Sequence, residues 1–139
     1  MTQSNPVAPP PTKREPTWNE VLIYPLACAG AMLGAAAGAF VAKLASQSGF
    51  YAIIAVGILA GFGSLLLARR GNWITALIAA IIALVAALLT ESWLYPWYVD
   101  GIREDSLSYF IRHIPDMSPF RLLVHAIGAA CAGYIAWRK

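Results

Sequence analysis

Four long apolar segments constrain this chain more than any other feature. They cover about residues 21–45, 50–68, 73–93 and 119–137, and most charged side chains lie outside them. A helix needs about 20 apolar residues to cross the roughly 30 Å hydrocarbon layer of a membrane. We therefore predict an all-α fold, a four-transmembrane-helix bundle formed by residues 21–139.

The composition agrees with a membrane protein. Charged residues make up 12% of the 139 residues and hydrophobic residues 59%, whereas a soluble domain carries about 25% charged residues. The net charge of +3 comes from basic residues that lie mostly in pairs at segment ends, where they flank membrane spans. The sequence has no basic patch with interleaved aromatic residues. The expected partner is the lipid bilayer, and no nucleic acid is expected.

Residues 1–20 are predicted to form a disordered cytoplasmic tail. The tail is rich in proline, at Pro6, Pro9, Pro10, Pro11 and Pro16. Proline fixes φ and lacks a backbone N–H, which favours extended, polyproline-like chain. Such a tail is either a solvated leader or a ligand for an SH3-like domain. The apolar segment after it exceeds the 7–15 residues of a signal-peptide core, so we expect an anchor. Pro25 is expected in the first turn of that helix.

Residues 99–118 are more highly charged than the segments around them. Four apolar residues in this stretch have the i, i+3, i+4, i+7 spacing of one helix face: Leu107, Phe110, Ile111 and Ile114. This spacing predicts a short amphipathic helix within an external loop, with Asp105 as its N-cap and Pro115 as its end. Because three turns cannot span a bilayer, we expect this helix at the membrane interface.

The basic residues predict the orientation. Four spans place both termini on one side of the membrane. That side has six basic residues: Lys13, Arg14, Arg69, Arg70, Arg138 and Lys139. The other side has at most four: Lys43, Arg103, Arg112 and Arg121. Basic residues near span ends favour the cytoplasm. The prediction is a multi-pass protein of the bacterial inner (plasma) membrane with cytoplasmic N- and C-termini.

Glycines recur at four-residue spacing in the first two predicted helices. The first helix has Gly30, Gly34 and Gly38, and the second has Gly57 and Gly61. Small residues let helix backbones approach closely, and this contact drives helix association in lipid. The turn at residues 46–49 makes the two helices antiparallel neighbours. We expect their glycine faces to meet, and self-association through the longer face is the alternative.

Three ionisable residues form a candidate intramembrane polar cluster: Glu91, His125 and Lys43. An ionisable side chain inside a membrane is a functional candidate. Glu91 continues an alanine stripe and His125 begins a small-residue face, so both are expected to face the bundle interior near its outer end. Glu91 is expected to pair with His125 or with Lys43, unless Lys43 snorkels outward. The cluster either fixes helix register or binds a proton or ligand.

Sequence motifs of catalysis are missing. There is no HExxH, GxSxG or phosphate loop. Cys28 and Cys131 form no CxxC pair, and both are interpreted as packing residues. We expect no enzyme, and no catalytic residue, metal or cofactor.

The predicted function is that of a non-enzymatic accessory or assembly subunit. It would act by helix packing, in a homo-oligomer or with a membrane-protein partner. The inner halves of the spans have no charge, which disfavours a conducting monomer because an ion path needs polar groups through the full thickness. The alternative is a small oligomeric channel or transporter that uses Glu91 and His125.

Three stretches resemble a known group of proteins. They are the glycine-rich first helix, the segment SGFYAIIAVGILAGFGSLLLARRG and the Ile/Ala-rich third helix. Together they resemble a group of small bacterial four-span membrane proteins of uncharacterised function, over about Gly30–Leu89 and, more loosely, the last span. Some members carry a zinc ribbon or a low-complexity leader before the hairpin. This chain lacks the ribbon cysteines and has only the Pro-rich leader. The resemblance implies the four-span fold and no activity.

Overall fold

The computed structural model describes residues 18–94, 97–99, 102–104 and 107–138. This part of the chain is mainly helical, and the predicted all-α class is confirmed. Its elements are α1 (Trp18–Gln47), α2 (Ile54–Ala68), α3 (Trp73–Leu94), β1 (Trp97–Val99), β2 (Ile102–Glu104), α4 (Leu107–His113), the 3₁₀ turn η1 (Ile114–Asp116) and α5 (Pro119–Trp137). Of the tail predicted at residues 1–20, residues 1–17 lie outside the described residues, as does the predicted N-cap Asp105, whereas residues 18–20 belong to α1 and correct that boundary.

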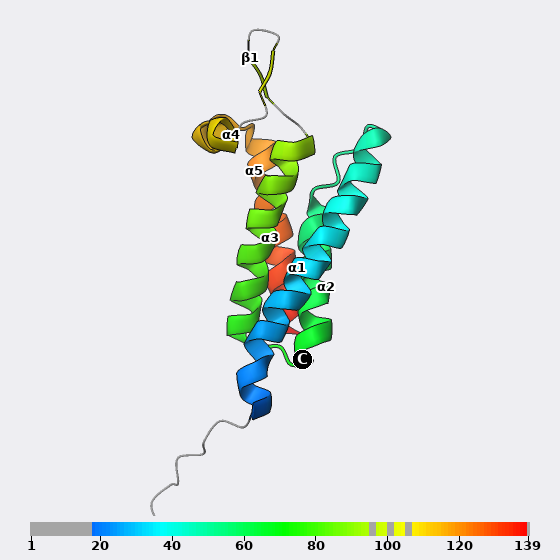
Figure 1. Ribbon diagram of the computed structural model, residues 1–139, viewed down its shortest axis with the longest axis vertical. Helices are drawn as coiled ribbons and strands as arrows, with labels where there is room; N and C mark the ends of the chain where they lie inside the picture. The colour runs from blue at the N-terminus through cyan, green and yellow to red at the C-terminus, as the bar shows by residue number, and fades with distance from the viewer. Residues whose placement is uncertain (1–17, 95–96, 100–101, 105–106, 139) are drawn as a thin grey trace, which may run out of the picture.

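Helices α1, α2, α3 and α5 run side by side along the long axis of the molecule (Figure 1). Their contacts follow a simple pattern. Helix α1 packs mainly against α2, α2 also packs against α5, and α3 contacts both α5 and α1. The start of α1 and the C-terminus lie at one end of this bundle, and β1 and α4 lie at the other (Figure 1).

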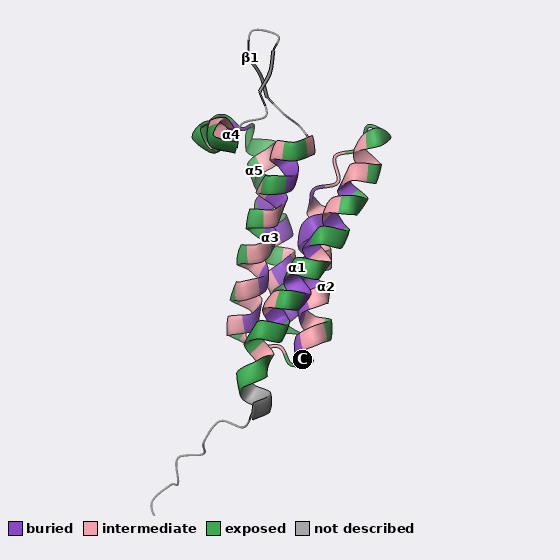
Figure 2. Cartoon of the chain, viewed as in Figure 1, coloured by how far each residue is buried: buried purple, intermediate pink, exposed green. Residues whose placement is uncertain are grey.

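Small side chains lie inside the bundle and large ones outside. Figure 2 shows the buried positions along the facing sides of the helices. Fully buried positions include Ala27, Ala60 and Ala132, whereas Leu33 is 66% exposed and Leu66 is 69% exposed. A water-soluble protein buries most of its large aliphatic side chains. Helices in lipid pack through small residues and turn large apolar ones outward. The observed distribution is therefore that of a helical membrane protein.

Three described helices are long and apolar enough to cross a membrane. They are α1 from Val21 to Gln47, α3 and α5. Helix α2 has 15 residues, so it is about 22 Å long at 1.5 Å per residue. This length is below the roughly 30 Å of the hydrocarbon layer.

The second apolar segment becomes helical later than predicted. The sequence predicts a span at residues 50–68, but α2 begins at Ile54. Helix α1 instead continues to Gln47, and the chain then turns at Gly49, whose φ of +79° suits glycine. The N–H of Phe50 donates to the carbonyl oxygen of Ala45 at 3.0 Å, which closes this turn. The chain between Gln47 and Ile54 is therefore not helical.

Helix α1 also begins earlier than predicted. It starts at Trp18, so Pro25 lies inside the helix and not in its first turn. Proline has no N–H to donate four residues back, and the carbonyl of Val21 therefore receives no helical hydrogen bond from it.

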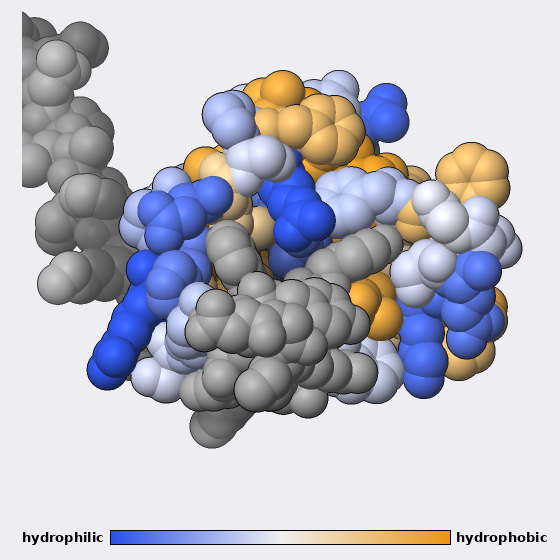
Figure 3. Space-filling view, turned by 90° about the horizontal axis from the view of Figure 1, so that it is seen from above, coloured by the Kyte–Doolittle hydropathy of each residue, from blue (hydrophilic) through white to orange (hydrophobic). Residues whose placement is uncertain are grey.

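The segment 99–118 contains less helix than predicted. A two-stranded hairpin, in which Tyr98 pairs with Arg103, occupies its start. Helix α4 has only seven residues and buries Phe110, while Ile111 of the predicted apolar face is 57% exposed. Helix α4 runs across the bundle axis (Figure 1). Figure 3 looks onto this end, where hydrophilic side chains lie among apolar ones.

The start of α5 agrees with the prediction. Ser118 is its N-cap and Pro119 its first residue. The Oγ atom of Ser118 accepts a hydrogen bond from the N–H of Arg121 at 3.4 Å, a side-chain cap that satisfies one free donor of the first turn. This cap places Arg121 at the end of the bundle where α3 finishes.

Candidate functional site

Glu91 is the only acidic residue of α3, and its side chain is fully buried. It follows Ala79, Ala83 and Ala87 at four-residue steps, and these alanines are buried as well. Residues four apart share one face of a helix. The sequence therefore carries a carboxylate onto the buried face of α3, three residues before the helix ends at Leu94.

Two side chains from other segments contact the Glu91 carboxylate. The Tyr51 hydroxyl donates a hydrogen bond to Oε2 at 2.6 Å, and Nη1 of Arg121 lies 3.1 Å from Oε1. The contact with Arg121 is an ion pair without hydrogen-bond geometry. Tyr51 precedes α2 and Arg121 lies in the first turns of α5, so the carboxylate joins three segments. An unpaired carboxylate at this depth would cost several kcal/mol.

Arg121 approaches the carboxylate from the end of the bundle. Its side chain is 39% exposed, whereas that of Glu91 is fully buried. The next residue back, Phe120, has its ring centroid 6.3 Å from that of Tyr51, with the ring planes tilted by 46°. Such an aromatic pair holds Tyr51 against the start of α5. Both partners of Glu91 are thus positioned by α5.

These contacts correct the expected pairing of Glu91 with His125 or Lys43. Among the described residues, no hydrogen bond or ion pair joins Glu91 to either of them. From the sequence, Arg121 is expected only as a flanking charge, and Tyr51 is expected inside the second span. One signal was available, because Arg121 lies four residues before His125 and shares its helix face.

His125 is buried, with 2% of its surface exposed. Its Nδ1 atom lies 2.7 Å from the carbonyl oxygen of Arg121. A carbonyl only accepts, so Nδ1 carries a proton and donates it. The other ring nitrogen, Nε2, is buried and has no hydrogen-bond partner among the described residues. In the neutral ring Nε2 is an acceptor.

Lys43 contacts an aromatic ring and not a carboxylate. Its Nζ atom lies 4.7 Å from the centroid of the Trp93 ring, a cation–π contact between α1 and α3. Trp93 is 57% exposed. Of the three residues in the predicted polar cluster, Lys43 therefore lies on a separate, outward-facing contact.

The glycine face of α1 packs directly against the backbone of α2. A Cβ atom added at Gly30, Gly34 or Gly38 would overlap main-chain atoms of α2, and at Gly34 the overlapped atom is the carbonyl oxygen of Leu59. Only glycine permits backbones this close. These glycines therefore set the spacing between α1 and α2.

Gly57 and Gly61 face α5 and not α1. A Cβ atom at Gly57 would overlap the backbone of Gly128, and one at Gly61 would lie 2.8 Å from Cα of Ala132. The expectation that the two glycine faces meet is therefore corrected. Helix α2 uses another glycine, Gly63, against α1, and lies between two neighbours at close range.

The buried polar side chains lie mainly at the two ends of the bundle. In the described chain they are Ser64, Thr75, Thr90, Glu91 and His125. Below Thr90, the buried face of α3 carries only alanines until Thr75 near its start. The described residues also contain no group of three His, Cys, Asp or Glu side chains that could hold a metal ion. Among the described residues, no buried polar side chain of α3 therefore connects the cluster around Glu91 with Thr75 at the other end of the helix.

Comparisons with protein-family models, with curated proteins and with solved structures find no match to this chain. The resemblance to small bacterial four-span proteins remains a prediction.

Proposed function

We propose that this chain is a four-span integral membrane protein that acts as a non-enzymatic accessory or assembly subunit. The observation that carries this proposal is the pairing of Glu91 with Tyr51 and Arg121. A carboxylate held by a hydroxyl and a guanidinium from two other segments fixes how those segments pack. Each oxygen of this carboxylate already contacts a protein side chain, so the carboxylate is a poor candidate for binding a substrate.

The close helix contacts support the same proposal. Gly34 on α1 and Gly57 on α2 leave no space for a methyl group, so α1, α2 and α5 form a tightly specified unit. An accessory subunit presents such a unit to a partner helix or to another copy of itself. The exposed apolar side chains of α1 and α3, such as Leu33 and Leu77, supply a surface for that contact.

A purification experiment tests the accessory role. The tagged chain, solubilised in mild detergent, should carry a second membrane protein or a second copy at fixed stoichiometry. Gly34→Leu, which forces α1 away from α2, should lose this partner. Gly128→Ala is the matched control, because the nearest atom to its added Cβ is 3.7 Å away, and it should keep the partner. A monodisperse monomer without any partner contradicts the proposal.

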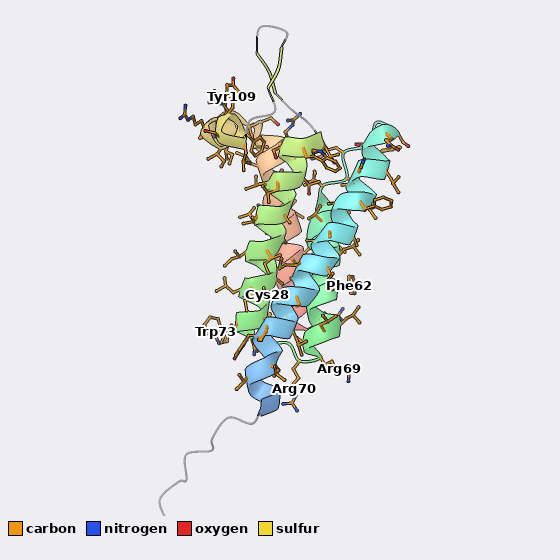
Figure 4. All side chains as sticks on the ribbon, viewed as in Figure 1. Cys28, Phe62, Arg69, Arg70, Trp73 and Tyr109 are labelled. Atoms are coloured by element: carbon orange, nitrogen blue, oxygen red, sulfur yellow. The ribbon has the colours of Figure 1, made fainter. Side chains whose placement is uncertain are left out.

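The four-span arrangement requires α2 to cross the membrane together with the non-helical residues before it. Arg69 and Arg70 at the end of α2 lie at the opposite end of the bundle from Tyr109 on α4 (Figure 4), and the C-terminus lies at the same end as the two arginines (Figure 1). This placement supports cytoplasmic termini under the positive-inside rule. It also supports an interfacial position for α4, which runs across the bundle axis (Figure 1).

Cysteine labelling tests this arrangement. In a background with Cys28→Ala and Cys131→Ala, an impermeant maleimide should label Ser48→Cys, an exposed position in the turn between α1 and α2, in intact cells. Arg70→Cys should react only after the cells are permeabilised. If both positions react from the same side, α2 does not cross the membrane.

A transport function in an oligomer is the second candidate, and the unpartnered Nε2 of His125 favours it. A proton carrier would need this atom and Glu91 together. Purified protein in liposomes should show no proton flux above protein-free liposomes. A flux that Glu91→Gln and His125→Gln both abolish would replace the accessory role by transport.

A further inference from the structure

An apolar groove runs between α1 and α3 on the outer surface of the bundle. Its volume is about 490 Å³, and its walls include Cys28, Ala36 and Ala39 from α1 and Ile81, Val85 and Leu89 from α3. Several of these side chains are exposed, including Ile81 at 53% and Val85 at 51%. The groove therefore opens to the surroundings of the bundle.

The groove offers no free hydrogen-bonding group from its walls except the thiol of Cys28. The other polar wall residue is Thr90, and its Oγ1 already donates to the carbonyl oxygen of Ala86 at 2.7 Å. A thiol is a weak donor and behaves as a small apolar group. The body of any occupant must therefore be apolar.

The length of the groove matches one leaflet of a bilayer. Cys28 and Ala39 are eleven residues apart in α1, which corresponds to about 16 Å at 1.5 Å per residue. Half of a hydrocarbon layer of about 30 Å is about 15 Å. A second transmembrane helix would pack along a full span, whereas an acyl chain occupies one leaflet.

A cation lies at one end of the groove. Lys43 is four residues after Ala39 and Trp93 is four residues after Leu89, so each continues the wall of its own helix by one turn. The Nζ atom of Lys43 lies 4.7 Å from the centroid of the Trp93 ring. Within the described chain no carboxylate forms an ion pair with Lys43, and an ammonium on an aromatic face keeps donors for an anion.

We propose that this groove binds an anionic phospholipid, with one acyl chain between α1 and α3 and the phosphate at Lys43. Tryptophan and lysine are the residues that meet headgroups at a membrane interface. The inference needs α1 and α3 to lie in a bilayer, as proposed above, but not the accessory role. The lipid would fill the open groove between α1 and α3.

Native mass spectrometry of the delipidated full-length protein tests this inference. Phosphatidylglycerol should bind with a stoichiometry of one, about fivefold more tightly than phosphatidylcholine with the same chains, the preference that one basic residue gives near an anionic headgroup. Lys43→Gln should remove this preference. Arg69→Gln, which removes a charge at the other end of the bundle, should keep it. Equal binding of the two lipids by the unmodified protein overturns the proposal.

A second pair of variants tests the place of binding. Ala36 is exposed and lines the groove, so Ala36→Phe should fill it and abolish binding of both lipids. Ala37 is exposed next to it but outside the groove wall, so Ala37→Phe should bind lipid normally. If Ala36→Phe instead dissociates a dimer that crosslinks through Cys28, a second copy occupies the groove and the proposal is wrong. A Lys43→Gln protein that loses the lipid preference but retains its protein partner separates this inference from the accessory role.

Discussion

The hydroxyl of Tyr51 donates a 2.6 Å hydrogen bond to the buried carboxylate of Glu91 on α3, forty residues later in the chain. Tyr51 lies in the non-helical stretch before α2, so this bond ties that stretch to the end of α3. The carboxylate of Glu91 also forms an ion pair with Arg121 of α5. The contact therefore connects a turn, a helix end and a helix start in one polar cluster.

Tyr51→Phe should destabilise the protein by about 1–3 kcal/mol, the range for a hydrogen bond to a charged group whose partner is left unsatisfied. The free energy of unfolding can be measured by titration with SDS from mild detergent, followed by far-UV circular dichroism. Tyr134→Phe is the matched control, because Tyr134 is 61% exposed on α5. Its effect should stay within about 0.5 kcal/mol. Equal effects of the two substitutions would show that the Glu91 contact does not stabilise the fold.

A double-mutant cycle between Glu91→Gln and Arg121→Gln should show favourable coupling. The carboxylate is fully buried and the arginine is 39% exposed. We therefore expect a coupling above the ~1 kcal/mol of an exposed pair and below the ~3–5 kcal/mol lost on breaking a fully buried one. The same unfolding titration measures it. The pair His125→Gln and Glu91→Gln is the comparison, and a larger coupling there would reassign the partner of Glu91.

Gly57→Ala and Gly128→Ala should differ although the two glycines face each other. A methyl group at Gly57 would overlap the Gly128 backbone, whereas one at Gly128 has its nearest neighbour, Cα of Ile54, at 3.7 Å. Overpacking costs about 1–3 kcal/mol, and Gly→Ala inside a helix gains up to about 1 kcal/mol. Gly57→Ala should therefore lower the free energy of unfolding, and Gly128→Ala should leave it unchanged or raise it. The reverse order would place the close contact elsewhere.

Asn72→Ala should weaken the start of α3. The N–H of Thr75 donates to Oδ1 of Asn72 at 2.8 Å, and the N–H of Asn72 donates to Oγ1 of Thr75 at 2.9 Å. This reciprocal cap satisfies two backbone donors, and its loss should cost about 1 kcal/mol of unfolding free energy. Asn72→Ser retains an acceptor and should cost less. A cost for Asn72→Ser as large as that for Asn72→Ala would rule out a capping role.

The local pattern of the sequence determined the long helices. Apolar length predicted residues 73–93 and 119–137, and the observed helices are Trp73–Leu94 and Pro119–Trp137. These limits follow from neighbours in the chain, such as the cap at Ser118 and the proline after it. The four-residue spacing likewise placed Glu91 on the alanine face of α3, which the fold buries.

The tertiary structure alone decided which residues meet. Helical periodicity gives the face and depth of a side chain, but it does not say which neighbour lies opposite. For this reason Glu91 met Tyr51 and Arg121, and Gly57 met Gly128 of α5 and not the glycines of α1. Helix α2 begins only at Ile54. The residues before it, 48–53, are not helical, and Tyr51 among them bonds to Glu91. Apolar length gives only the greatest extent of a helix, and it does not reveal the contact between Tyr51 and Glu91 that lies just before this one begins.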